Sequence, residues 1–117
     1  MQVHVTARKF KAHKPLRDYA SHGVSRLAKF YDGIVRGDVV LSYEKSTNSL
    51  KWAEVSLQVH GTVLTAKEKS EDFTKSIDKA IGKLERQLSK YKTRLRLKDR
   101  RTLRKVKEDS VLEEEEE

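Results

Sequence analysis

The fold of this protein is decided by residues 70–96, which run SEDFTKSIDKAIGKLERQLSKYKTRLR. Apolar side chains recur there at steps of three and four, the spacing of one face of an α-helix. The stripe consists of Phe73, Ile77, Ala80, Ile81, Leu84, Leu88, Tyr91 and Leu95. Ser70 is a suitable N-cap, and Glu71 and Asp72 would then lie in the first turn, where the helix dipole favours acids. The pattern predicts one long helix from about Ser70 to residue 96.

The opposite side of this predicted helix carries only positive charge. At about 100° per residue, its basic side chains fall within an arc of about 100°. They are Lys75, Lys79, Lys83, Arg86, Lys90 and Arg94. A merely solvated helix usually mixes signs, because like charges at a spacing of four repel each other. We therefore predict that this face binds a phosphate backbone, and the alternative is a solvated face that happens to be basic.

The residues before the long helix alternate between strand and helix patterns. The predicted strands are residues 2–7, 34–45, 52–60 and 62–68, with a turn at 46–49. Residues 14–31 predict a first helix, because Pro15 suits a first turn and apolar residues follow at helical spacing. The order β-α-β-β-β-α predicts an α+β fold in which a four-stranded sheet carries both helices on one face. The first helix can link the first two strands as a parallel crossover.

Strand 52–60 has the clearest alternation of apolar and polar residues. Its inward positions are Ala53, Val55, Leu57 and Val59. Trp52 falls on the outward side, where two roles are open to it. It can stack on a nucleic-acid base, or it can pack on a loop or a neighbouring strand.

Length and charge narrow the class of protein. The chain has 117 residues and no cysteine, which favours one domain without disulfides in a reducing, cytoplasmic setting. The longest apolar run is far short of the roughly 20 residues that span a bilayer, so we expect no membrane partner. The net charge is +8, yet seven acids and no base follow Lys107, so residues 1–107 carry +15. A charge of this sign favours polyphosphate partners such as RNA.

The charge pattern also divides the chain. We predict a folded domain over residues 1–96 and a mobile charged tail over residues 97–117, basic at first and acidic at its end. The acidic run Glu113–Glu117 is typical of a solubilising segment. Alternatively, it folds loosely over the basic helix and competes with nonspecific RNA.

Catalytic and metal-binding patterns are missing from the sequence. The four histidines, His4, His13, His22 and His60, fall on separate predicted elements without the spacing of zinc ligands. The sequence contains no GxSxG elbow and no glycine-rich phosphate loop. We predict a protein that is not an enzyme and needs no metal or other cofactor.

Segments of both predicted helices resemble the ribosome hibernation promoting factors and their relative protein Y. These segments are DFTKSID at 72–78, KLERQL at 83–88, LRDY at 16–19 and FYD at 30–32. The resemblance spans about residues 1–96 and implies the same β-α-β-β-β-α fold. It implies that Lys83, Arg86 and Lys90 lie on a helix that faces rRNA, whereas Lys75, Lys79 and Arg94 rest on periodicity alone. The chain differs from the family at Gly23, where Lys is common, and at Ser76, where Ala is frequent.

The resemblance also implies a function. Proteins of that family occupy the mRNA and tRNA channel of the small ribosomal subunit, contact 16S rRNA and stop translation in idle or stressed cells. We therefore predict a cytoplasmic translation inhibitor that binds the small subunit of the 70S ribosome and is monomeric when free. The alternative is a structural RNA-binding protein that uses the same basic helix face.

Overall fold

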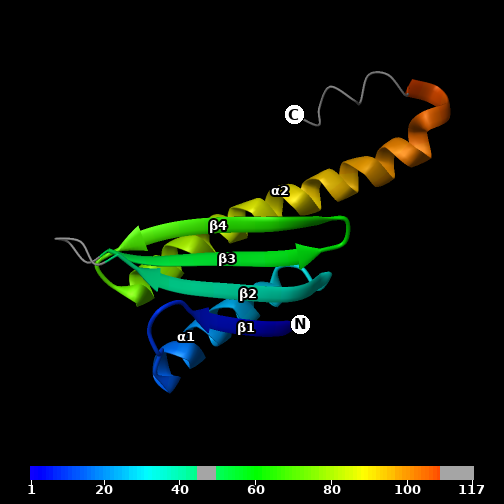
Figure 1. The fold of residues 1–117 in the computed structure, drawn as a ribbon. Coiled ribbons are helices and arrows are strands. Elements are labelled where there is room, and N and C mark those ends of the chain that lie inside the picture. Colours follow the sequence, from blue (N-terminus) through cyan, green and yellow to red (C-terminus); the bar gives the residue numbers. More distant parts are fainter. Residues whose placement is uncertain (45–49, 109–117) are drawn as a thin grey trace.

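The chain forms one four-stranded sheet with two helices behind it (Figure 1). The computed structural model describes residues 1–44 and 50–108, with side chains up to residue 97. Its elements are β1 (Gln2–Ala7), α1 (Lys14–Ser25), the 3₁₀ helix η1 (Arg26–Lys29), β2 (Ile34–Tyr43), β3 (Lys51–Val59), β4 (Thr62–Ser70) and α2 (Phe73–Glu108). The predicted α+β fold is confirmed, whereas the predicted turn at 46–49 lies outside the described residues.

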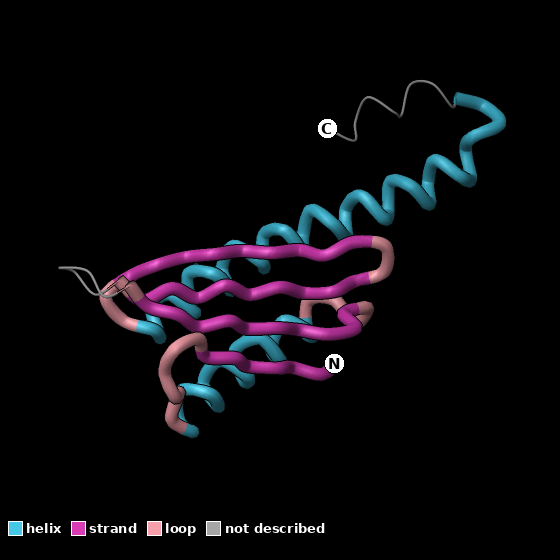
Figure 2. Tube along the Cα trace, viewed as in Figure 1, coloured by secondary structure: helices cyan, strands magenta, loops and turns pink. Residues whose placement is uncertain are grey.

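The strands follow one another across the sheet in the order β1-β2-β3-β4. β1 pairs with β2 in parallel, and the other two pairs are antiparallel. A parallel pair needs a crossover connection, and here α1 supplies it. Figure 2 shows both helices on the same side of the sheet, so the other face of the sheet is left open.

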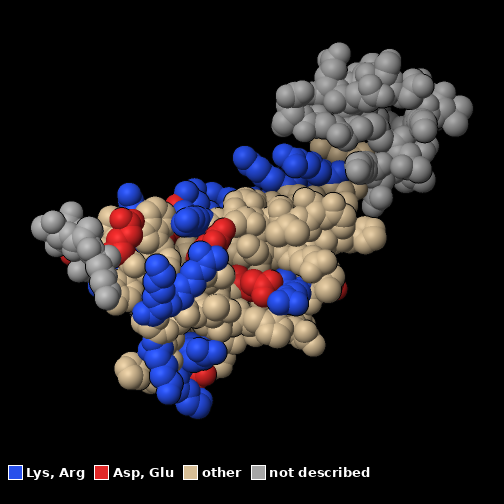
Figure 3. All heavy atoms as spheres, in the orientation of Figure 1, with Lys and Arg blue, Asp and Glu red and all other residues tan. Residues whose placement is uncertain are grey.

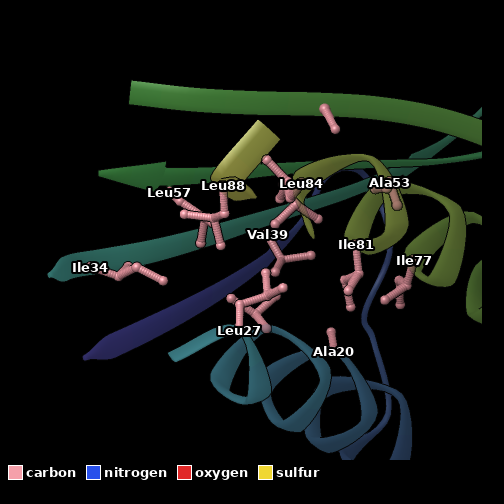
Figure 4. Packing of buried hydrophobic residues seen from close by; sticks show 14 of the residues in the cluster. Ala20, Leu27, Ile34, Val39, Ala53, Leu57, Ile77, Ile81, Leu84 and Leu88 are labelled. Carbon is pink, nitrogen blue, oxygen red and sulfur yellow. The ribbon is translucent and has the colours of Figure 1, made fainter. Parts of the chain in front are cut away.

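The core lies between the sheet and the two helices. The inward positions predicted for β3 are all buried, and so are the central residues of the α2 stripe. Figure 4 shows these side chains converging from α1, α2 and the inner face of the sheet. Leu84 and Leu88 are fully buried, whereas Phe73 and Tyr91 are partly buried against the edges of this core. The apolar stripe read from the sequence is therefore the face of α2 that packs on the sheet.

The start of α2 differs from the prediction. Ser70 is the last residue of β4, and the helix begins at Phe73, so Ser70 is not its N-cap. Asp72 takes that role, because its Oδ1 accepts hydrogen bonds from Thr74 N at 3.2 Å and from Thr74 Oγ1 at 3.0 Å. Extended pairing of β4 with β3 continues as far as Ser70 and outweighs the local helix signal.

A buried hydroxyl ties the first turn of α2 to the sheet. Ser76 is fully buried, and its Oγ donates a hydrogen bond to Lys51 O at 2.6 Å. The same oxygen lies 2.8 Å from Ser70 Oγ. The hydroxyl that distinguishes this position from alanine is thus satisfied inside the protein.

The first helix is shorter than predicted and meets α2 closely. The α-helix ends at Ser25, and η1 carries the chain on to Lys29, a tightening common at helix ends. Gly23 is buried, and a Cβ at this position would come within 2.7 Å of Ile81 Cδ1. The glycine therefore allows α1 to approach α2, and a lysine here would have to displace Ile81.

The second helix continues beyond the expected boundary of the domain. Its helical backbone passes residue 96 and reaches Glu108. Figure 1 shows this part extending past the edge of the sheet. The acidic residues 109–117 lie outside the described residues, so the division into a domain and a tail stays a prediction.

Truncating the buried stripe of α2 is expected to destabilise the fold without touching its outer face. Leu84→Ala or Leu88→Ala should each lower the free energy of unfolding by about 2 to 5 kcal/mol, because buried methyl groups are lost and a cavity remains. The control, Arg86→Ala, changes an exposed side chain and should stay within about 0.5 kcal/mol. Urea denaturation measures both. Equal stability of Leu84→Ala and Arg86→Ala would contradict this placement of the helix.

Candidate nucleic-acid interface

The core fixes the rotation of α2 and thereby places the predicted basic side chains in solvent. All six predicted residues, Lys75, Lys79, Lys83, Arg86, Lys90 and Arg94, are exposed. We call them the basic helix face. At 1.5 Å per residue, 20 residues of helix extend about 30 Å, enough to follow several phosphates.

On one side of the basic helix face, α1 and the segment after it form hydrogen bonds with α2. Tyr19 Oη donates to the carboxylate of Asp78, at 2.7 Å from Oδ1 and 2.9 Å from Oδ2. Lys92 Nζ donates to Phe30 O at 2.6 Å. The carboxylate of Asp78 is therefore engaged by a tyrosine from α1.

On the other side, α2 contacts the edge strand β4. Gln87 Nε2 donates to Thr65 O at 3.0 Å, and Lys83 forms an ion pair with Glu68. The residues of the helix itself place no acid on this face, as predicted, but Lys83 is paired with an acid from β4. A projection of the helix cannot show a residue that another element brings to it. The face is thus directed away from α1 and toward the side of β4.

The remaining five cations of the basic helix face have no carboxylate partner in the part of the chain that the structure describes. Among the described residues, Lys75, Lys79, Arg86, Lys90 and Arg94 form no ion pair or hydrogen bond through their side chains. Figure 3 shows Lys and Arg side chains following α2 along the top of the molecule. A row of unpaired cations is the electrostatic arrangement that a phosphate backbone neutralises.

Trp52 packs on its neighbouring strand. Its Nε1 donates to Glu44 Oε1 at 2.6 Å, and the ammonium groups of Lys67 and Lys69 lie 4.8 and 5.1 Å from the ring centroid. The second of the two roles left open by the sequence is the one observed. No role was predicted for these lysines from the sequence, although the alternation along β4 places both on the same side as Trp52.

The described residues contain no arrangement suited to a metal. They include no group of three His, Asp or Glu side chains that converge on one point. The four histidines are all exposed and lie on different segments. No helix in the described part of the chain is long and apolar enough to cross a membrane.

Comparison with known proteins identifies the family. Residues 3–96 match the family described as Sigma 54 modulation protein / S30EA ribosomal protein. This match covers most of the chain, and the protein belongs to that family, which includes the ribosome hibernation promoting factors. The resemblance seen in the two helices is confirmed.

Individual relatives agree in both sequence and fold. The chain is 36% identical over 97 residues to a ribosome hibernation promotion factor of Deinococcus radiodurans, covering 80% of this chain and 51% of that protein. It is 33% identical over 92 residues to a ribosome hibernation promoting factor of Pseudomonas putida, covering 79% of this chain and 87% of that protein. A ribosomal subunit interface protein from Coxiella burnetii has the same fold, with a TM-score of 0.72 at 26% identity over 80% of this chain and 99% of that one. The chain thus spans about half of the first relative and nearly all of the other two.

The contact between α1 and α2 should depend on pH at the alkaline end. The hydrogen bond to Asp78 raises the pKa of Tyr19 above its usual value. The neutral phenol is therefore favoured in the folded state. Its stabilisation is complete below the unfolded pKa of about 10 and is lost as the pH rises through the folded pKa.

Tyr19→Phe should lower the free energy of unfolding by about 1 kcal/mol at neutral pH, and this difference should shrink above about pH 10. Denaturation at a series of pH values measures it. The control is Tyr43→Phe, because the Tyr43 hydroxyl makes no hydrogen bond among the described residues. A pH-independent loss in Tyr19→Phe would show that the hydroxyl is not the cause.

Proposed function

We propose that this protein is a ribosome hibernation factor that inhibits translation. It binds the small subunit of the 70S ribosome in the cytoplasm of idle or stressed cells and occupies the mRNA and tRNA channel. The observation that carries the proposal is the exposed basic helix face, in a family whose relatives bear the name of hibernation factors. The subunit interface protein of Coxiella burnetii supports the same partner.

The chemistry of the basic helix face suits binding without reading of sequence. Lysine and arginine neutralise phosphates and release their counterions, and this contribution to affinity does not depend on the bases. The six cations follow one helix for about 30 Å, a length that suits contact with successive phosphates of a backbone. We infer that the face contacts 16S rRNA through its backbone and recognises its shape.

We propose different roles for residues 1–96 and residues 97–117, in line with the extent of the family match. Residues 3–96 match the family, and we propose that residues 1–96 form the ribosome-binding domain. Residues 97–117 then act as a charged extension. Free in solution, the protein is proposed to be a monomer, because the basic helix faces of two copies would repel each other.

Removing two cations from the middle of the basic helix face tests the contact. Arg86→Ala together with Lys90→Ala should weaken binding to small subunits by on the order of 2 kcal/mol and lower the log-log salt slope by roughly two units. Titration at several salt concentrations measures both. The control, Lys14→Ala, removes an exposed cation that is already paired with Asp18 and should change the slope little. An unchanged affinity and slope in the folded double variant would remove the basic helix face from the interface.

Competition tests the place of binding on the ribosome. Saturating mRNA and initiator tRNA should displace the protein from 30S subunits, because both are proposed to use the same channel. Co-sedimentation of the protein with the subunits measures the displacement. Unchanged binding would exclude the channel and favour a structural RNA-binding role. Ribosome occupancy at each stage of growth also distinguishes the two roles, because a structural protein would be present on ribosomes at every stage.

A further inference from the structure

A second group of cations lies away from the basic helix face, at one end of the open face of the sheet. Figure 3 shows a band of Lys and Arg side chains running over this end, from β4 to the connection between β1 and α1. We call this group the open-face cluster. It consists of Arg8, Lys9, Lys11, Lys67 and Lys69, all of them exposed.

Trp52 holds two cations of the open-face cluster side by side. Lys69 is the direct cross-strand partner of Trp52, and Lys67 lies two residues earlier on the same side of β4. Both ammonium groups lie close to the ring of Trp52, at 4.8 and 5.1 Å from its centroid. Each contact is favourable, yet the two like charges repel each other. An anion bound between them would relieve this repulsion.

The connection between β1 and α1 presents the other three cations on an anchored backbone. The ring of Phe10 stacks on Phe73 with centroids 5.1 Å apart and meets Tyr43 edge-on at 5.6 Å. Lys9 has a φ of 64°, a left-handed conformation that is costly for a lysine. Such strain persists only where the surroundings hold it and is common at binding sites.

The strand register joins these two parts into one surface. Arg8 N donates to Leu41 O at 2.8 Å, which extends the pairing of β1 by one residue beyond Ala7. Arg8 therefore lies beside Ser42, and Ser42 is the cross-strand partner of Trp52. Across the sheet, Arg8 and Lys69 therefore lie in the same row, with Ser42 and Trp52 between them.

Two acids lie near the open-face cluster, and among the described residues neither forms an ion pair with it. Glu44 is engaged by Trp52 Nε1, and Glu54 is half-buried as the cross-strand partner of Lys67. Among the described residues, none of the five cations forms an ion pair. By contrast, Arg36, at the far end of the same face, is paired with Asp38 at 3.0 Å.

We propose that the open-face cluster is a second binding surface for RNA phosphates, on the side of the sheet opposite the helices. Its cations are spread over β4 and the connection after β1, which suits a strand of phosphates better than the single carboxylate of a small ligand. Lys67 and Lys69 contact the phosphates, and Trp52 positions their ammonium groups. This goes beyond the proposed function, since either surface can bind RNA without the other.

The protein carries its own probe for this site, because Trp52 is its single tryptophan. Titration of the full chain with a short oligouridine at low salt should change Trp52 fluorescence saturably. In Lys67→Gln/Lys69→Gln the affinity should fall on the order of tenfold, with the log-log salt slope lower by one to two units. Arg8→Gln/Lys11→Gln should weaken binding similarly while leaving the lysines at Trp52 in place. Circular dichroism shows that each variant is folded.

The matched control is Lys14→Gln/Arg36→Gln, which removes two exposed cations that are each ion-paired. It loses the same net charge and should lose far less affinity. An equal loss in this control would overturn the proposal, since only total charge would then matter. RNA binding without a change in Trp52 fluorescence would also overturn it, as would tighter binding of an oligoglutamate peptide than of oligouridine.

A variant of the basic helix face distinguishes the proposed function from the proposal for the open-face cluster. Arg86→Gln/Lys90→Gln should retain the fluorescence response of Trp52 to oligouridine while binding 30S subunits more weakly. If this variant binds 30S subunits normally, the proposed function fails while the open-face cluster stands. If it loses the Trp52 response altogether, the open-face cluster is not an independent site and the proposal is overturned.

Discussion

Burial of the apolar stripe of α2 against the sheet is the constraint from which the other features follow. Leu84 and Leu88 are fully buried beneath β3 and β4, and each contributes on the order of 2 kcal/mol through the area removed from water. A helix packed in this way cannot rotate without exposing those side chains. The rotation places the opposite side in solvent, and that side carries the six cations. Core packing and the proposed function are therefore linked through one helix.

The repulsion between the like charges on that helix is offset by contacts with other elements of the fold. Neighbouring cations at a spacing of four each cost a few tenths of a kcal/mol. Contacts on the two flanks help to hold the helix in place. On one side Tyr19 binds Asp78, and on the other Lys83 pairs with Glu68 while Gln87 caps a carbonyl of β4. These contacts engage Lys83 and leave the other five cations of the basic helix face open to a partner.

The edge strand β4 serves both faces of the molecule because its side chains alternate. Glu68 turns toward α2 and meets Lys83, whereas Lys67 and Lys69 turn toward the open face and Trp52. Lysines on an edge strand also discourage pairing with another chain. The same residues thus protect the edge and, in our proposal, supply a second surface for phosphates.

The sequence by itself determined the order of the elements, the buried stripe and the six exposed cations, because helical and strand periodicities are local properties of the chain. It did not determine where α2 begins, because extended pairing with β3 carries β4 to Ser70 and leaves Asp72 as the cap. Only the tertiary structure decided that Gly23 faces Ile81 and that two lysines share the ring of Trp52. Those contacts depend on which segments the fold brings side by side, and no spacing along the chain encodes that directly.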